Sequence, residues 1–432
     1  MARRKIHLIS KITSREILDS RGNPTVEATV HLDSGLNFKA SAPSGASTGS
    51  HEAVELRDND KKRYSGKGVL NACKNIDSLI SDRLKGIDVI NQKEIDEALI
   101  ELDGTDNKQK LGANATIAVS LCCAKAGASV SDMELHEYVR KTFELPDWHQ
   151  KMPTPMFNIF NGGKHADTNL NIQEFMVVPI FDTSFAEKVR AGSEMFHQLG
   201  NVLHDNFLDT DVGNEGGYAP NIDSTIQAFD LITEAIAKSG YKAGAQIGIA
   251  LDIGASELYD KQKNVYNFEL DENYLIADQL ITLYRDWSSK YPIISIEDGL
   301  AEDAWEDWVN MSEQFSMFKT KNPAYKMMLV GDDLVTTNLE RLKKNVNKKA
   351  ANAVIVKPNQ IGTLLETVKF VKYAQKYDYK IITSHRSGET TDDYIADLAI
   401  AFNSDFVKFG STSRGERTCK YNRLMEIEQN IK

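Results

Sequence analysis

The stretch IGIALDIG at residues 247–254 is an apolar run that ends in an aspartate, Asp252. Five similar runs follow it: PIISIEDG (292–299), MMLVGDD (327–333), AVIVKPNQ (353–360), KIITSHR (380–386) and FVKFGS (406–411). Each is typical of a buried strand with a polar or charged side chain at its end. Successive strand-end residues are 23 to 45 positions apart, which is room for one strand, one helix and the next strand.

This rhythm predicts an α/β fold built from repeated βα units. It favours a TIM-type barrel over a doubly wound sheet, because no glycine-rich dinucleotide fingerprint follows any of the runs. The carboxyl ends of barrel strands converge on one face. We therefore expect one pocket to contain the residues that end the six runs: Asp252, Glu297, Asp332, Lys357, His385 and Lys408.

The first part of the chain has a different pattern. Short alternating runs between residues 6 and 44 are separated by turn sequences, RGNP and DSG, which indicates a small antiparallel sheet. Between residues 69 and 130 the apolar residues recur at helical spacing. We predict an N-terminal α+β capping domain over residues 1–145 and a catalytic α/β barrel over 146–432, beginning at a proline-rich linker, PDWHQKMPTP.

Composition excludes several classes of protein. With 432 residues, 41% hydrophobic and 26% charged, the chain has the composition of a globular protein. A net charge of −11 argues against a protein that mainly binds phosphate backbones, so nucleic acid is not the expected substrate. The four cysteines show neither a disulfide framework nor zinc-ligand spacing.

Neither a signal peptide nor a membrane span is expected. In MARRKIHLIS the basic residues precede a mixed pattern instead of an apolar segment with a cleavage site. The most apolar stretch, 111–130, carries Lys125 and many small residues, and we interpret it as a buried helix. The predicted location is the cytoplasm.

Three of the strand-end residues are carboxylates, Asp252, Glu297 and Asp332. An Asp-Asp pair such as Asp332-Asp333 is, by itself, usually a helix cap or a solvated turn. At corresponding strand ends, however, three oxygen donors could share a hard cation such as Mg²⁺. The pattern therefore predicts a metal site.

The cationic strand ends suggest an anionic substrate. Lys357 leaves a buried strand, where it either snorkels to solvent or acts chemically. A metal and Lys408 on the same face would lower the pKa of Lys357 and let it act as a base. Arg386 and Ser387 follow His385 and could form an exposed turn, but a guanidinium beside a hydroxyl is also what bound phosphate or carboxylate requires.

Two glycine-rich stretches, SGASTG (44–49) and GNEGGYAP (213–220), are most simply flexible loops. SGASTG lacks the lysine of a P-loop, which disfavours nucleotide binding. Glu215 lies between glycines and could be a surface residue or a general acid beside a cationic pocket. By themselves, His165, Gln173 and Glu174 are most simply a mixture of core and surface residues.

The chain resembles the enolases over essentially its whole length. The matching segments occur in the family's order: DSRGNPTVE (19–27), SGASTG, HEAVELRD (51–58), FNIFNGGKHA (157–166), QEFMVVP (173–179), EGGYAP (215–220), SIEDGLAEDAW (295–305), VGDDL (330–334), NQIGTL (359–364) and SHRSGET (384–390). The resemblance implies an enolase-type TIM barrel with a smaller N-terminal α+β domain. It also implies that the second strand and first helix of the barrel depart from strict βα repetition.

The activity implied by the resemblance is phosphopyruvate hydratase, a lyase of glycolysis and gluconeogenesis. It reversibly dehydrates 2-phosphoglycerate to phosphoenolpyruvate with two Mg²⁺ ions per active site. The family is usually homodimeric and sometimes forms higher oligomers.

The resemblance also assigns a role to each matching residue. Asp252, Glu297 and Asp332 would hold the first Mg²⁺, and Ser47 would contribute to the second. Lys357 would accept the C2 proton, and Glu215 would protonate the departing C3 hydroxyl, with Glu174 supporting Glu215. His165 would complete the pocket. The residues implied in substrate binding are Gln173, His385, Arg386, Ser387 and Lys408.

Four positions depart from the family's commonest pattern: Asn214, Gly254, Pro358 and Phe409. None removes a catalytic group, but they leave a phosphonate analogue open as the substrate. A second alternative is a scaffold or surface-binding protein whose C-terminal Lys432 engages lysine-binding partners, with a surface or secreted pool reached without a signal peptide. A third, an acid-sugar dehydratase, is disfavoured by Arg386-Ser387 and SGASTG.

Overall fold

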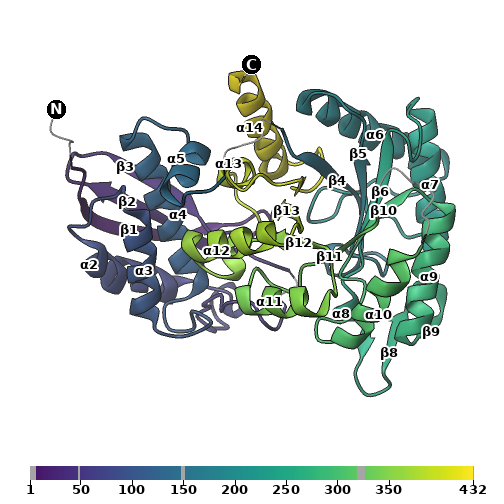
Figure 1. Ribbon diagram of the computed structural model, residues 1–432, viewed down its shortest axis with the longest axis horizontal. Helices are drawn as coiled ribbons and strands as arrows, with labels where there is room; N and C mark the ends of the chain where they lie inside the picture. Colours follow the sequence, from purple (N-terminus) through teal and green to yellow (C-terminus); the bar gives the residue numbers. More distant parts are fainter. Residues whose placement is uncertain (1–5, 47–48, 147–150, 319–325, 432) are drawn as a thin grey trace.

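The N-terminal part of the chain is a three-stranded antiparallel sheet covered by helices, at the left of Figure 1. The computed structural model describes residues 6–46, 49–146, 151–318 and 326–431. Strands β1 (Ile9–Leu18), β2 (Pro24–Leu32) and β3 (Asn37–Ser41) pair in sequence order. Gly22 and Gly35 lie in the two connecting turns with positive φ, which glycine adopts without strain. The predicted sheet is confirmed.

The helices of this part are α1 (Leu70–Asn75), α2 (Ser81–Leu84), α3 (Gln92–Asp103), α4 (Ala113–Val130) and α5 (Leu135–Thr142). Helix α4 packs against β2 and β3. Within the described residues it is the one helix long and apolar enough to cross a membrane, yet 83% of it is buried inside the fold. Its apolar sequence is therefore explained by its central position, as the sequence predicts.

The rest of the chain contains a closed barrel of eight strands. Their order around the barrel is β10 (Ile293–Glu297), β11 (Met328–Gly331), β12 (Ala353–Val356), β13 (Lys380–Ser384), β14 (Phe406–Lys408), β4 (Thr154–Asn161), β5 (Glu174–Pro179) and β6 (Ile247–Asp252). All six predicted runs are strands of this barrel. Apolar side chains fill its interior, among them Met176, Ile294 and Ile355, so polar chemistry is confined to the strand ends.

One strand breaks the parallel arrangement. Strand β5 is antiparallel to both of its neighbours, β4 and β6. Only residues 162–173 join β4 to β5, with no complete helix between them, and a short connection of this kind produces an antiparallel pair. Two helices, α6 (Phe185–Asp205) and α7 (Thr225–Lys238), then precede β6. This is the departure from strict βα repetition that the family resemblance implies.

Seven further helices and a small second sheet belong to the barrel part of the chain (Figure 1). The helices are α8 (Ala255–Leu258), α9 (Ala277–Lys290), α10 (Trp305–Ser316), α11 (Leu339–Lys348), α12 (Leu364–Lys376), α13 (Tyr394–Ala401) and α14 (Gly415–Ile431). A small second sheet contains β7 (Tyr259–Asp260), β8 (Val265–Phe268) and β9 (Asn273–Leu275). Short helical turns complete the chain: η1 (Tyr64–Gly66), η2 (Ile76–Ile80), η3 (Gly163–His165), η4 (Glu269–Asp271) and η5 (Pro358–Gln360).

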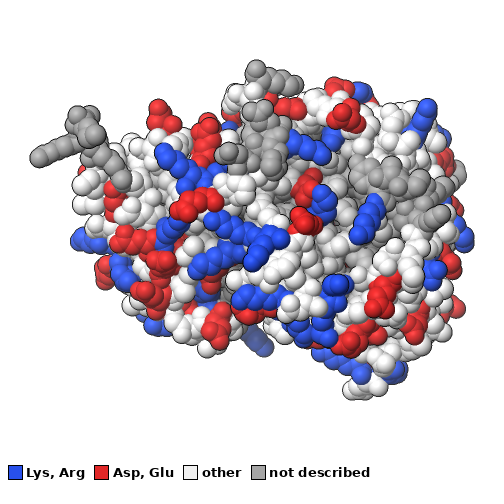
Figure 2. Space-filling model, in the orientation of Figure 1, with Lys and Arg blue, Asp and Glu red and all other residues white. Residues whose placement is uncertain are grey.

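Charge is distributed unevenly over the surface. Figure 2 shows Lys and Arg gathered on the face where α11 and α12 lie, although the chain as a whole is acidic. Each of these two helices carries three lysines. That nucleic acid is not the substrate stays a prediction.

A buried aspartate joins the N-terminal helices to the barrel. Asp96 of α3 accepts hydrogen bonds from the backbone N–H of Leu365 (2.8 Å), in the first turn of α12, and from Gln92 Nε2 (2.9 Å). The Ser120 hydroxyl of α4 accepts from the N–H of Leu364 (3.1 Å). Helices α3 and α4 of the N-terminal part thus accept hydrogen bonds from two N–H groups in the first turn of α12, which have no partner within their own helix.

The unfolding free energy should depend on pH through Asp96. Burial raises the pKa of Asp96 to about 7, whereas an aspartate in an unfolded chain has a pKa of about 3.9. The folded state therefore binds the proton more tightly. The stability contributed by protonated Asp96 is complete below about pH 4 and is lost as the pH rises through about 7. Asparagine cannot titrate, so the wild type should lose stability relative to Asp96→Asn between about pH 5 and pH 8.

Urea unfolding of both proteins at the two pH values measures this change. The matched control is Asp82→Asn, at an exposed position on α2. A difference between wild type and Asp96→Asn that is the same at both pH values would show that Asp96 does not titrate in this range.

Candidate active site

The strand ends meet in one pocket, as predicted. Glu174 of β5, Asp252 of β6 and Glu297 of β10 are register partners on neighbouring strands, and Lys408 is the partner of Ser384. The cavity between the side chains has a volume of about 20 Å³. It is lined by His165, Gln173, Glu174, Glu215, Asp252, Asp332, Lys357, Ser384, His385, Arg386, Ser387 and Lys408. Every predicted site residue lines it except two: Glu297, which contacts the lining residue Lys408, and Ser47, which is outside the described residues.

Lys408 occupies the centre of the carboxylates. Its Nζ lies 2.7 Å from Asp252 Oδ2, 2.8 Å from Glu297 Oε1 and 3.2 Å from Glu174 Oε1. Burial alone would lower the pKa of Lys408, but Asp252, Glu174 and Glu297 raise it well above its ordinary value. The ammonium group is therefore charged throughout the physiological range.

Lys357 forms an ion pair with Asp332, whose other carboxylate oxygen accepts from Gln360 Nε2 at 2.9 Å. The expectation that a bound metal together with Lys408 lowers the pKa of Lys357 stays a prediction. Burial, Arg386 and Lys408 do lower it, but the contact with Asp332 outweighs them and raises that pKa. Lys357 can act as a base only when Asp332 no longer pairs with it.

The carboxylates fit a cation in part. Among the described residues no hydrogen-bond partner reaches the buried Glu297 Oε2, and burial together with Asp252 raises the pKa of Glu297 well above its ordinary value. Both observations indicate excess negative charge that a hard cation would neutralise. Asp332 also belongs to a compact acidic group with Asp298 and Asp333, whose ligand atoms all lie within 4.8 Å of one another. The site therefore offers oxygen ligands, although lysines hold several of them.

Glu215 lies among two histidines and an amide. Its Oε2 accepts from Asn158 Nδ2 at 3.1 Å and is 3.2 Å from His385 Nε2, and its Oε1 is 3.5 Å from His165 Nδ1. Burial alone would raise the pKa of Glu215, but His165 and His385 hold it well below its ordinary value. In this arrangement Glu215 is a carboxylate.

Two titratable side chains, His165 and Glu174, lie next to Glu215. His165 Nδ1 is also 3.4 Å from Glu174 Oε1. Burial alone would lower the pKa of His165, but Glu215 and Glu174 raise it. Burial and the charge of Glu215 also raise the pKa of Glu174. His165 Nδ1 therefore lies between Glu174 and Glu215, and among the described residues it has no hydrogen-bond partner.

Arg417 is a site residue that the sequence patterns do not reveal. It is fully buried on α14, and its Nη1 donates to His385 Nδ1 and to the carbonyl of Arg386, both at 2.6 Å. Burial, with a smaller effect of Arg417, lowers the pKa of His385 to about 3, so this imidazole is neutral. Since Nδ1 accepts from Arg417, the proton of His385 is on Nε2, which faces Glu215. Arg417 lies on a helix, so the strand-end pattern does not reveal it.

The N-terminal domain packs against the loop that follows β13, next to the site. Backbone hydrogen bonds link Ser44 and Gly388 in both directions at 2.8 Å, and the N–H of Ser20 donates to the carbonyl of Glu389 at 2.7 Å. A Cβ on Gly388 would lie 2.3 Å from Asp19 Oδ2, so this approach requires glycine. The segments DSRGNPTVE and SGASTG thus meet SHRSGET.

Gly254 has a structural explanation. Its φ is positive, and a Cβ at this position would lie 2.3 Å from the side chain of Gln173. The glycine therefore leaves space for Gln173 at the pocket. The neighbour of Glu215, Asn214, contributes backbone atoms: its carbonyl accepts from Arg417 Nη2 at 2.9 Å. Pro358 begins η5, and Phe409 is buried next to Tyr421.

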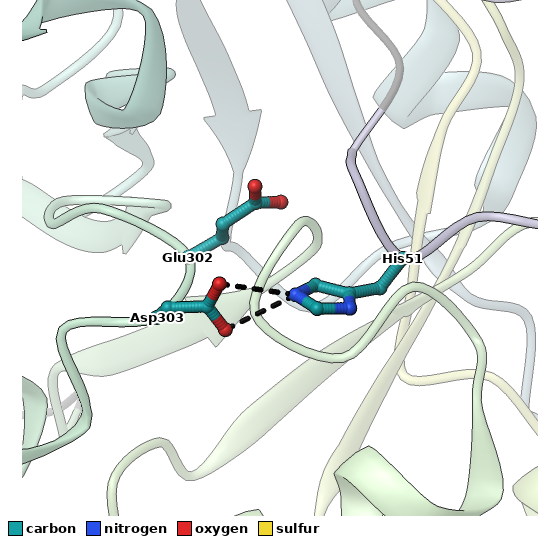
Figure 3. Close-up of side chains that lie close together, drawn as sticks. All are labelled: His51, Glu302 and Asp303. Atoms are coloured by element: carbon teal, nitrogen blue, oxygen red, sulfur yellow. Dashed lines mark hydrogen bonds and ion pairs between the residues drawn. The ribbon is translucent and has the colours of Figure 1, made fainter.

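A second group of metal-ligand types lies near the domain boundary. Figure 3 shows the His51 ring directed at Asp303, with Glu302 beside it. His51 Nε2 is 3.1 Å from both Asp303 oxygens, and the Ser50 hydroxyl donates to Glu302 at 2.6 Å. The group is largely exposed and already paired, so it serves as a contact between the domains.

Comparison with protein families agrees with this architecture. The family model described as "Enolase, N-terminal domain" matches residues 9–139. The model described as "Enolase, C-terminal TIM barrel domain" matches residues 149–432. The predicted boundary at 145/146 falls between the two matches and stays a prediction, since residues 147–150 are outside the described ranges.

Proposed function

Because the chain belongs to the enolase family, we propose that it catalyses the reversible Mg²⁺-dependent dehydration of 2-phosphoglycerate to phosphoenolpyruvate. The family supports a lyase-type activity, and the site supports this particular substrate. The observation that carries the proposal is the grouping of Lys357, Arg386, Ser387 and Lys408 around one cavity with strand-end carboxylates.

The chemistry requires concentrated positive charge. A proton next to a carboxylate is barely acidic, because removing it places a second negative charge on that group. Mg²⁺ bound by Asp252, Glu297 and Asp332, with a second ion to which Ser47 contributes, would supply positive charge at the substrate carboxylate. Lys408 supplies a further fixed charge at the same strand ends.

Two residues divide the proton transfers. Lys357, in its neutral form, accepts the proton from C2 and becomes an ammonium ion. Glu215, once protonated, gives a proton to the C3 hydroxyl, which leaves as water; we expect its neighbours His165 and Glu174 to supply that proton. The electron pair of the C2–H bond forms the new double bond, so the reaction needs no external oxidant or reductant.

Substrate recognition falls to the cationic side of the pocket. Arg386 and Ser387 would bind the phosphate, since a guanidinium and a hydroxyl match its oxygens. Gln173, His165 and His385 would complete the pocket around the substrate. The phosphate site favours this substrate over an acid sugar, which has no phosphate to occupy it.

Cellular context is proposed on the family resemblance alone. We propose a homodimer or larger homo-oligomer acting in glycolysis and gluconeogenesis in the cytoplasm. Lys432, which would engage lysine-binding partners in a surface role, lies outside the described residues.

Product formation tests the proposal. Absorbance of the enol product at about 240 nm should rise when about 1 mM 2-phosphoglycerate, above typical KM values, is added with Mg²⁺. Excess chelator should stop the reaction, and restored Mg²⁺ should restart it. No turnover in folded, Mg²⁺-supplied protein would contradict the proposal. Turnover of the phosphonate analogue alone would identify a divergent substrate.

A further inference from the structure

Arg386, the residue assigned to the substrate phosphate, is paired with a carboxylate from the other domain. Glu52 Oε2 lies 2.8 Å from Arg386 Nη1, and Glu52 Oε1 lies 3.2 Å from Nη2, so the two groups meet as a two-pronged fork. The side chains are 8% and 3% exposed. Burial alone would lower the pKa of Arg386, but Glu52 raises it.

Other bonds hold Glu52 in place. Its Oε1 accepts from the backbone N–H of Gly49 at 3.1 Å and from Gln360 Nε2 at 3.4 Å. The next residue, Ala53, donates its N–H to the carbonyl of Gln360 at 2.8 Å. Glu52 would therefore stay beside the barrel if Arg386 shifted away from it.

Arg386 also lies between two cavities. One is the small cavity of the candidate active site, and the other has a volume of about 300 Å³ and is lined by Glu52, Glu55, Asn114 and Asn359, among others. A guanidinium has donors on more than one edge, so it can share them between Glu52 and a second anion.

We propose that Glu52 is a positioning residue that serves as the internal counter-ion of Arg386. When phosphate binds, some of the guanidinium N–H groups that pair with Glu52 donate to the phosphate instead. The inference rests on the proposed function, since it takes Arg386 as the phosphate ligand. It goes further by assigning to Glu52, a residue of the N-terminal domain, control over how tightly the phosphate is bound.

The direction of this control follows from the charges. A buried arginine without a partner is strongly unfavourable, so Glu52 stabilises the protein when the site is empty. When phosphate binds, the same carboxylate competes for the guanidinium and repels the dianion. Removing the charge of Glu52 makes the empty state less stable and the bound state less repulsive. Both effects strengthen phosphate binding.

The test is the affinity of Glu52→Gln for inorganic phosphate, measured by isothermal titration calorimetry. Glutamine keeps an oxygen that can accept from Gly49 but removes the charge. We expect the Kd to fall about tenfold or more, because the lost charge lies within hydrogen-bond distance of Arg386. Without phosphate the variant should unfold at a lower temperature than the wild type, and saturating phosphate should reduce this difference.

Glu55→Gln is the matched control. Glu55 lines the same cavity, but its carboxylate pairs with Arg57 Nη2 at 2.6 Å and accepts from the Ser44 hydroxyl at 3.1 Å. Its replacement should change the phosphate Kd much less than that of Glu52. If Glu52→Gln does not fold, Glu52→Asp provides a second test: the shorter side chain draws the carboxylate back from Arg386 and should also tighten phosphate binding.

Kinetics provide an independent readout. Glu52→Gln should lower the KM for 2-phosphoglycerate without raising kcat, because substrate and transition state gain the same phosphate binding. An unchanged or higher phosphate Kd in folded Glu52→Gln would overturn the inference.

The variant Arg386→Gln separates a failure of the proposed function from a failure of the role proposed for Glu52. If this variant binds phosphate as the wild type does, Arg386 is not the phosphate ligand and the proposed function itself loses support. If it loses phosphate binding while Glu52→Gln gains none, only the role of Glu52 is refuted.

Discussion

Lys357→Ala is expected to abolish exchange of the C2 proton of 2-phosphoglycerate with solvent, and to reduce turnover by about 10²- to 10⁴-fold, the usual contribution of a general base. Substrate binding should persist, since Arg386, Ser387 and Lys408 are unchanged. Nuclear magnetic resonance in deuterated water measures the exchange, and calorimetry measures the binding.

Because Lys357 forms an ion pair with Asp332, the Lys357→Ala variant has a second readout, its affinity for Mg²⁺. Removing Lys357 leaves Gln360 as the one side chain among the described residues that donates to Asp332, so the variant should bind Mg²⁺ at least as well as the wild type. Lys348→Ala is a control, because that lysine pairs with Glu306 on the outer surface of the barrel. Ordinary exchange in folded Lys357→Ala would eliminate this lysine as the base.

Glu215→Gln is expected to separate the two proton transfers. The variant should still exchange the C2 proton, because Lys357 is intact, but dehydration should fall by about 10²- to 10⁴-fold without the acid. The amide can still accept from Asn158, so the local packing should survive. Exchange and product formation are measured on the same sample.

The electrostatics of Glu215 add a second expectation. His165 and His385 hold it as a carboxylate in the free protein, so it must gain a proton before it can act as the acid. We expect its neighbours Glu174 and His165 to supply that proton. Replacing Glu174 with glutamine should therefore slow dehydration more than C2 exchange. If Glu215→Gln instead loses both reactions equally, the two steps do not have separate catalysts.

The barrel could be predicted because its signal is local. Six of the eight barrel strands are apolar runs that end in a functional residue, as with Asp252 of β6 and Lys408 of β14. Parallel strands place their carboxyl ends together, so the order of runs along the chain was enough to gather the site. The antiparallel β5 was expected only from the family resemblance, because strand direction depends on how the connection is routed and not on the residues of the strand.

Other features of the site depend on contacts between distant segments. Glu52 and Arg386 are 334 residues apart, and Arg417 reaches His385 from a helix that carries no strand-end pattern. Their pairing follows from how the N-terminal domain and α14 pack on the barrel.

The sequence by itself determined the two-part architecture, the barrel and most of the residues that line its pocket. It did so because hydrophobic periodicity is a property of neighbouring residues. Only the tertiary structure decided the charge states: Lys357 has a raised pKa because Asp332 contacts it, and Glu215 is ionised because two histidines face it. A pKa depends on burial and on charges a few ångströms away, and both are set by the folded arrangement.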